Sequence, residues 1–107
     1  MPHAHDVFFL LNDGSPAKCE ALVKDCYDFL KGHDGIIEFS AGTRALDCTR
    51  DVNDLQFHVS LRVLFADTAS HDAYQTAPRH LEFVKRNKAL WKAVRVFDST
   101  ISPVRKG

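Results

Sequence analysis

The polar side chains best placed to do chemistry in this chain are those that interrupt an apolar pattern. On a helical wheel that begins at His80, one arc holds these apolar residues: Phe83, Val84, Leu90 and Trp91, with Leu81 at its margin. His80 and Asn87 fall at the centre of that arc. A buried polar group costs roughly 1–3 kcal/mol unless it is hydrogen-bonded or faces a cavity. His80 is therefore either a core histidine bonded to a backbone carbonyl or a side chain that points into a pocket between helix and sheet.

Two further side chains can join His80. His5 shares one side of an expected strand with Val7, so it can face inward, although a histidine near a strand end is often partly solvated. Tyr74 precedes Pro78 on a helix that the proline interrupts, and its hydroxyl is either in water or aimed at a partner. Because helical spacing does not carry across the proline, the sequence leaves open whether Tyr74 and His80 meet.

The cysteines and the other histidines form no clear nucleophile or metal motif. Cys19 and Cys26 lie on the apolar stripe of an expected helix, and we expect them to be core thiols. Cys48 lies in a polar stretch with no neighbouring base, so the reactivity of its thiol is open. The pair His3 and His5 keeps metal binding open, but no other ligand set has convincing spacing. The sequence therefore predicts no metal and no cofactor.

Composition restricts the classes of function. The 107 residues include 14 Lys+Arg and 14 Asp+Glu, which give a net charge of zero, whereas a nucleic-acid-binding protein usually has a basic excess. No apolar run approaches the roughly 18 residues of a membrane span, and the N-terminus lacks the features of a secretory signal. Three cysteines without a Cys-x-x-Cys motif favour a reducing compartment. We expect a small cytoplasmic domain that binds neither nucleic acid nor membrane.

Hydrophobic periodicity predicts one domain over residues 1–101 and a flexible tail over 102–107. Strands are expected over 3–11, 35–46, 55–65 and 94–101. Helices are expected over 16–31, where Gly32 follows, over 68–76, and over 79–91. The resulting order, β-α-β-β-α-β, is typical of a ferredoxin-like α+β fold, an antiparallel sheet with helices on one face.

The first strand adds a prediction about assembly. Its two sides are both apolar, with Val7 and Phe9 on one and Phe8 and Leu10 on the other. Helices cover only one face of such a sheet, so the second apolar side needs another cover. A homodimer that packs sheet to sheet supplies that cover.

Four segments together resemble the stress-responsive α/β-barrel (Dabb) family over about residues 3–101. They are His5-x-Val7-x-Phe9, Val63-Leu64-Phe65, the stretch from Tyr74 to Val84, and Val96-Phe97-Asp98. The most specific piece is Tyr-x-x-x-Pro-x-His-x-x-Phe-Val, which begins at Tyr74. The family usually has His-Pro-x-His, and this chain has Ala77 in place of the first histidine, so the resemblance implies no role that needs both. It does imply a ferredoxin-like subunit that pairs as a dimeric α+β barrel.

The resemblance also implies site residues. The motif is similar to that of a plant polyketide cyclase of this family, which forms olivetolic acid. The catalytic histidine and tyrosine of that enzyme correspond to His80 and Tyr74, and a pocket histidine corresponds to His5. A pocket tryptophan and a tyrosine of the first helix correspond to Trp91 and Tyr27.

Three hypotheses follow. In the first, the protein is a homodimer of unassigned physiological role whose small apolar pocket binds a small molecule. In the second, it is a cofactor-independent, polyketide-cyclase-like enzyme for an apolar carbonyl compound, with His80 as general base, Tyr74 as hydrogen-bond donor to the carbonyl and His5 as an orienting group. The residues expected to contact the substrate are Tyr27, Phe83, Asn87 and Trp91. In the third, it resembles haem-binding monooxygenases of related dimeric barrels, with His80 as the iron ligand.

Overall fold

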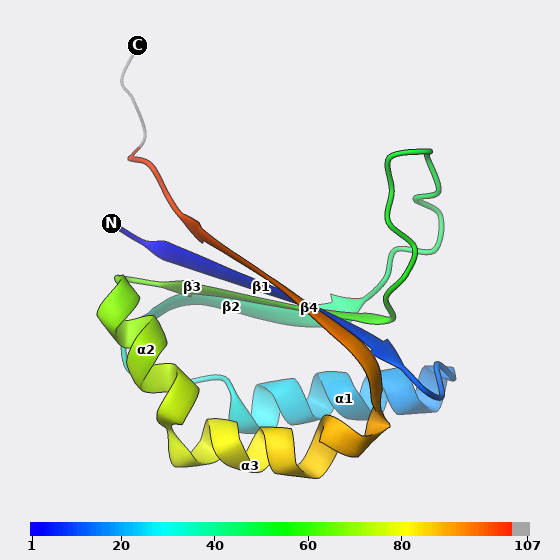
Figure 1. Cartoon of the computed structure of the whole chain (residues 1–107), viewed down its shortest axis with the longest axis horizontal. Helices are drawn as coiled ribbons and strands as arrows, with labels where there is room; N and C mark the ends of the chain where they lie inside the picture. Colours follow the sequence, from blue (N-terminus) through cyan, green and yellow to red (C-terminus); the bar gives the residue numbers. More distant parts are fainter. Residues whose placement is uncertain (104–107) are drawn as a thin grey trace.

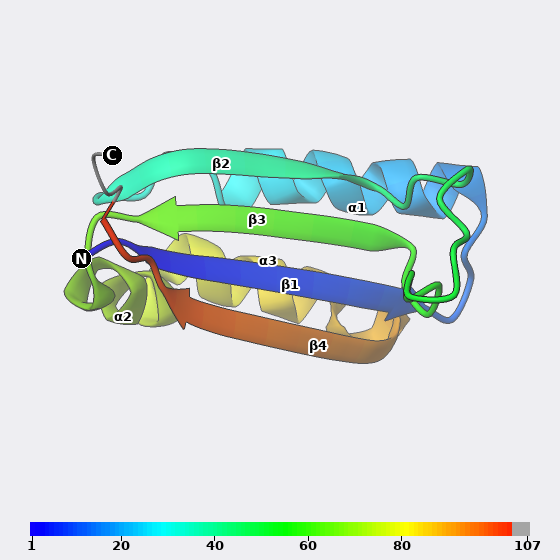
Figure 2. The ribbon, with the colours of Figure 1, turned by 90° about the horizontal axis from the view of Figure 1, so that it is seen from above.

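Four strands with alternating burial form the sheet of the computed structural model, which describes residues 1–103. The strands are β1 (His3–Leu11), β2 (Ile36–Thr43), β3 (Val59–Phe65) and β4 (Trp91–Thr100). All neighbouring pairs are antiparallel, and the order across the sheet is β2-β3-β1-β4 (Figure 2). This is the ferredoxin-like α+β arrangement that the sequence predicts.

The helices lie on one face of the sheet, as Figure 1 shows. They are α1 (Pro16–Phe29), α2 (Thr68–Thr76) and α3 (Pro78–Asn87), and a short 3-10 turn, η1 (Lys88–Leu90), follows α3. Pro16 occupies the first turn of α1, where its missing N–H is no loss. The carboxylate of Asp67 caps α2 by accepting a hydrogen bond from the backbone N–H of Ser70 at 2.8 Å. Helices α1 and α3 run beneath the strands, and α2 packs at one end of the sheet.

The core lies between this helical layer and the inward side of the sheet. The inward residues of β1 and β3 are nearly inaccessible: Val7, Phe9, Leu11, Val59, Leu61, Val63 and Phe65. Cys19 and Cys26 of α1 are buried with them, which confirms the prediction of two core thiols, whereas Cys48 is exposed. Because β1 and β3 supply the centre of the sheet, any side chain on their inward face is either in the core or at its rim.

The opposite face of the sheet carries the second apolar side of β1. Asp6 of β1 pairs with Phe97 of β4 and Arg62 of β3, so these three side chains share that face. No helix of the described residues covers it, and residues 44–58 rise beside it on the same side (Figure 1). We call this surface the open face.

Several element ends differ from the sequence prediction. Helix α1 ends at Phe29, before the expected residue 31, and β2 and β3 are shorter than 35–46 and 55–65. The largest difference concerns the segment predicted as helix over 79–91: α3 ends at Asn87, and Trp91 already begins β4. The backbone carbonyl of Leu90 accepts a hydrogen bond from Asn12 at 3.0 Å, which ties the turn to the end of β1 instead of to a further helical turn.

Two remaining sequence predictions concern the tail and the membrane. Ser102 and Pro103 belong to no helix or strand, and residues 104–107 of the expected tail lie outside the described residues. Within residues 1–103, no helix combines the length and the apolar character needed to cross a bilayer.

The two-layer arrangement predicts a large loss of stability for one leucine truncation and almost none for another. Leu61→Ala removes a core side chain that is 3% exposed and should lower the free energy of unfolding by about 2–5 kcal/mol. Leu81→Ala alters a side chain of α3 that is 54% exposed and should change the free energy of unfolding by less than about 0.5 kcal/mol. Urea unfolding at one fixed protein concentration measures both values, and equal losses would contradict the assigned facing of β3.

Candidate functional site

A cavity of about 180 Å³ lies between α3 and the inward face of the sheet. Its wall is mostly aliphatic and aromatic, with few polar side chains. Five of the seven site residues predicted from the sequence line it: His5, Tyr74, His80, Phe83 and Trp91. The structure therefore brings these five side chains, from β1, α2, α3 and β4, to one partly open cavity.

The break between α2 and α3 places Tyr74 opposite His80. Ala77 is extended, with φ −63° and ψ 139°, because the ring of Pro78 disfavours the helical conformation in the residue before it. The chain changes direction there, and a new helix starts at Pro78. The rings of Tyr74 and His80 then meet edge to face, with centroids 4.7 Å apart. The contact that helical spacing left open is thus present.

Three polar atoms near the cavity are buried and have no hydrogen-bond partner among the described residues: Tyr74 Oη, His80 Nδ1 and Trp91 Nε1. All three residues line the cavity. Buried polar groups in folded proteins are nearly always hydrogen-bonded, since an unpaired one costs about 1–3 kcal/mol. Such a concentration of unpaired donors and acceptors around one volume is typical of a site that receives a polar ligand atom.

Burial shifts the pKa of both central groups toward the neutral form. For Tyr74, burial raises the pKa of the phenol strongly, and the nearby Cys26 adds to the effect, so the hydroxyl remains a proton donor. For His80, burial lowers the pKa of the imidazole, the neighbouring His5 and His33 lower it further, and the backbone of Gln75 beside the ring raises it by less. At neutral pH the site therefore holds a phenol O–H beside an uncharged imidazole.

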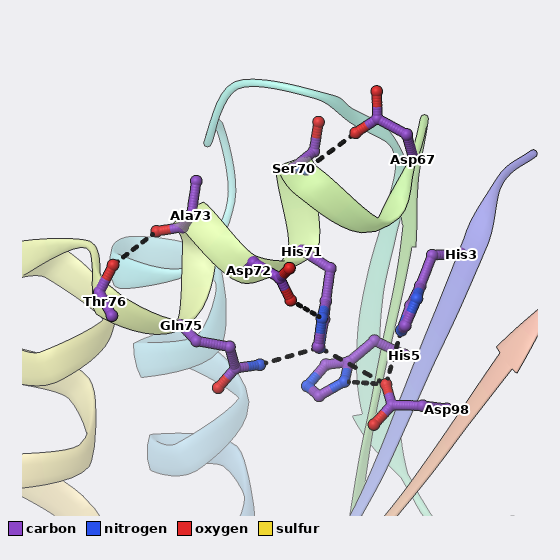
Figure 3. Close-up of polar contacts among 10 residues, drawn as sticks. All are labelled: His3, His5, Asp67, Ser70, His71, Asp72, Ala73, Gln75, Thr76 and Asp98. Atoms are coloured by element: carbon purple, nitrogen blue, oxygen red, sulfur yellow. Dashed lines mark hydrogen bonds and ion pairs between the residues drawn. The ribbon is translucent and has the colours of Figure 1, made fainter.

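His5 is oriented by a carboxylate at the end of the cavity. Its Nδ1 lies 2.7 Å from Asp98 Oδ1, and His3 Nε2 lies 2.9 Å from the same oxygen (Figure 3). Burial by itself raises the pKa of Asp98, but the hydrogen bonds from His3 and His5 outweigh it and hold the pKa below its ordinary value. The ring of His5 is 6.0 Å from that of Tyr74, so Asp98 fixes an imidazole beside the Tyr74–His80 pair.

Tyr27 does not line the cavity, contrary to the sequence prediction. Its hydroxyl accepts a hydrogen bond from the backbone N–H of Ala41 at 3.3 Å, and its ring packs on Phe39 with centroids 5.2 Å apart. The side chain is 40% exposed because α1 ends beside β2 at that point. Tyr27 therefore joins α1 to the edge of the sheet.

Asn87 is also away from the cavity. It is buried, but its Nδ2 donates to Asp25 Oδ2 at 3.1 Å and to the carbonyl of Phe83 at 2.9 Å. Its polar group is thereby satisfied inside the α1–α3 contact. The helical wheel identified a buried polar position correctly, but its amide is paired with a carboxylate of α1, and the pocket that Asn87 lines together with Asp25 is a different one.

Sequence reasoning missed two residues that lie beside the cavity and contact His5, namely His71 and Asp98. His71 precedes Tyr74 by three positions on α2, so the two lie on one helix face, and a wheel of that helix could have paired them. Asp98 is the cross-strand partner of His5, but this follows only from the register of β1 with β4. That register is a tertiary feature with no local signal.

The sequence matches the family model described as the stress-responsive A/B barrel domain (Dabb) over residues 4–101. No curated protein matches the chain. The match spans every element from β1 to β4, including all those that line the cavity.

Solved structures share the fold at low sequence identity. A Dabb family protein with a ferredoxin-like fold from Mesorhizobium loti is 22% identical, with a TM-score of 0.77, over 95% of this chain and 98% of that one. A dimeric ferredoxin-like protein of unknown function from Thermobifida fusca is 13% identical, with a TM-score of 0.78, over 94% and 92%. The hydroxynitrile lyase of Passiflora edulis is 19% identical, with a TM-score of 0.75, over 98% and 97%. These similarities show a shared fold.

The lowered pKa of His80 predicts a sign for the pH dependence of stability. Below the ordinary value of 6.5 the unfolded chain binds a proton at this histidine, whereas the folded chain does not until lower pH. The free energy of unfolding should therefore fall as pH drops through 6.5, and His80→Gln should make that fall shallower. An NMR titration of the His80 ring checks the cause directly, and a midpoint above 6.5 would contradict it.

Proposed function

The chain belongs to the stress-responsive A/B barrel domain family, and from this premise we propose that it forms a homodimer whose cavity binds a small apolar molecule with a carbonyl group. One observation carries the proposal: Tyr74 Oη and His80 Nδ1 are both buried, both lack a hydrogen-bond partner within residues 1–103, and both belong to residues of the cavity wall. A carbonyl oxygen accepts from the phenol, and the apolar wall suits the rest of such a molecule.

The size of the cavity limits the ligand. Pockets for drug-sized ligands measure about 300–1,000 Å³, whereas this cavity measures about 180 Å³. The occupant is therefore a compact molecule, on the scale of a single substituted ring. A haem group exceeds this volume, so the geometry gives the haem hypothesis no support.

The same two groups support proton transfer as the chemistry of the site. Neutral His80 takes a proton from the carbon next to the carbonyl, and the electron pair of that C–H bond moves onto the carbonyl oxygen as an enolate. Tyr74 donates a hydrogen bond to the developing oxyanion and, because its pKa is raised, keeps its own proton. His5, fixed by Asp98, orients the ligand beside the pair. No cofactor enters this step, and the imidazolium returns the proton to the product.

We expect the purified protein to accelerate exchange of the α-hydrogens of acetophenone with deuterium, measured by NMR in buffer that contains a chelator. His80→Gln should reduce the rate by about 10²–10⁴-fold, because it removes the base. Tyr74→Phe should reduce it by about 10²–10³-fold, because it removes the donor to the oxyanion. A hydroxynitrile is the second substrate to offer, since one structural neighbour is a hydroxynitrile lyase.

Leu81→Ala is the matched control, since Leu81 lies on the same helix as His80 and is exposed. It should exchange deuterium at the wild-type rate. Circular dichroism of each variant tests its folding. If the wild type and His80→Gln exchange deuterium at the same rate, the catalytic proposal fails. Saturation-transfer NMR from the protein to the ketone tests binding separately, and the absence of transfer with the wild type would contradict the proposed ligand binding as well.

The homodimer is proposed to form through the open face. The ring of Phe8 lies between those of Phe57, at 5.0 Å, and Phe97, at 5.7 Å, and Phe97 is 54% exposed. Carboxylates and guanidinium groups surround this aromatic cluster: Asp6, Asp54, Arg62 and Arg95. A two-fold axis can place the acids of one subunit against the bases of the other. Three structural neighbours are described as dimeric ferredoxin-like proteins, which supports a dimer of this chain and leaves the packing face to experiment.

Phe97→Asp should convert the dimer to a monomer, because two-fold symmetry brings two new charges into an apolar contact. Size-exclusion chromatography with light scattering should give twice the chain mass of 12.1 kDa for the wild type and one chain mass for the variant. Leu81→Asp, an equally exposed apolar residue on the helical side, should leave the mass unchanged. A variant at position 97 that remains dimeric would exclude the open face as the interface.

A further inference from the structure

We propose that His3, His5, His71 and Asp98 form a binding site for one divalent transition metal ion of the zinc type. This site lies at the end of the sheet where α2 packs against β1 and β4, and of its four residues only His5 also lines the cavity (Figure 3). The inference is independent of the proposed function, with which it shares that one imidazole.

The donor atoms already converge on one point. One nitrogen of each of the three imidazoles and one oxygen of Asp98 all lie within 4.8 Å of one another. The Asp98 Oδ1 atom is 2.9 Å from His3 Nε2, 2.7 Å from His5 Nδ1 and 3.5 Å from His71 Nε2. Tetrahedral zinc, with bonds of about 2.0–2.1 Å to nitrogen and oxygen, separates its donor atoms by about 3.3 Å. Small side-chain adjustments therefore turn the cluster into a coordination sphere.

Three elements fix the ligands independently. His3 and His5 alternate on β1 and thus project from the same face, and Asp98 lies opposite His5 across the β1–β4 pair. His71 approaches from α2, and its ring stacks on that of His3 with centroids 4.1 Å apart and planes inclined by 15°. An ion at this point would cross-link the first strand, the last strand and α2.

The charge of the ligand set suits a divalent cation. Three imidazoles that bind through neutral nitrogen atoms, together with one carboxylate, would leave a bound divalent ion with one net positive charge. That small net charge limits the cost of placing the ion at a partly buried site.

The surroundings of His71 resemble those of a metal-bound histidine. Its other ring nitrogen, Nδ1, lies 3.4 Å from Asp72 Oδ1 but has no hydrogen-bond partner among the described residues, so a small turn of the Asp72 side chain is needed before Nδ1 donates to this carboxylate, as metal-bound histidines commonly do. One competing contact exists: the amide of Gln75 lies 3.1 Å from His71 Nε2 and must turn aside when an ion binds. His71 Nε2, the ring nitrogen that faces Asp98, is thus the atom that would bind the ion.

Solvent reaches the cluster through the carboxylate. The side chains of His3, His5 and His71 are 12%, 7% and 14% exposed, whereas that of Asp98 is 40% exposed. The nitrogen ligands are therefore withdrawn from competing water, and an ion can enter past Asp98.

Isothermal titration with Zn²⁺ of tag-free protein, stripped of metal by a chelator, tests the site. We expect one ion per chain, and at least a tenfold weaker affinity for His71→Ala and for His3→Asn. His33→Ala, which removes a histidine outside the cluster, should bind as the wild type does. Co²⁺ should give the intense visible absorption of a four-coordinate site in the wild type and lose it in His71→Ala.

Binding that does not saturate at one ion per chain, or equal affinity in the wild type and both cluster variants, would overturn the proposal. His3→Asn changes the end of a strand and His71→Ala the surface of α2, so circular dichroism can establish that at least one of them folds. Neither residue lines the cavity. Exchange of ketone hydrogens in the presence of chelator therefore reports the proposed function separately from the metal site.

Discussion

The break in the helical chain at Ala77 and Pro78 is the constraint on which the site depends. Proline cannot continue the hydrogen-bond ladder and excludes the residue before it from the helical conformation, so Ala77 is extended and α3 starts afresh. The backbone of Leu81 still bonds to the carbonyl of Ala77 at 3.0 Å, which fixes the second helix directly after the break. A continuous helix would carry Tyr74 and His80 around different sides of one axis; the bend turns their rings toward each other.

The contrast between Asn87 and His80 explains why buried polar residues on one helix acquire different roles. Both interrupt the same apolar arc; Asn87 is buried, and His80 is partly buried. The amide of Asn87 donates hydrogen bonds to Asp25 and to a carbonyl of its own helix, which makes Asn87 part of the α1–α3 contact. His80 Nδ1 has no such partner among the described residues, and the phenol opposite it has none either. The free energy of unfolding of such a domain is about 5–15 kcal/mol. Two unpaired groups that cost about 1–3 kcal/mol each are a large fraction of it, which favours a role in binding over a role in the fold.

Much of this architecture is accessible from local sequence, because the signals involved are local. The alternation of Val7, Phe8 and Phe9 identifies β1, and the sequence Ser15-Pro16 marks the start of α1. Boundaries that depend on tertiary contacts are different. Leu90 and Trp91 continue the helical period of α3, yet the bond from Asn12 to the Leu90 carbonyl and the packing of Trp91 on Phe9 at 5.0 Å direct them into a turn and a strand. The same holds within the site: Asp98 reaches His5 only through the register of two strands that are distant in sequence.

Alternate side chains of β1 point to opposite faces of the sheet, so this one strand contributes to both. Its odd-numbered residues enter the layer between sheet and helices, where His3 and His5 meet Asp98 and where Val7 and Phe9 enter the core. Its even-numbered Phe8 projects the other way, into the aromatic cluster of the open face. A shift of one residue in the pairing of β1 would exchange these faces, turning His3 and His5 toward the open face and Phe8 into the layer between sheet and helices. The tight core contacts of Val7 and Phe9 exclude that shift, so hydrophobic packing at the centre of the strand fixes the positions of the imidazoles at its end.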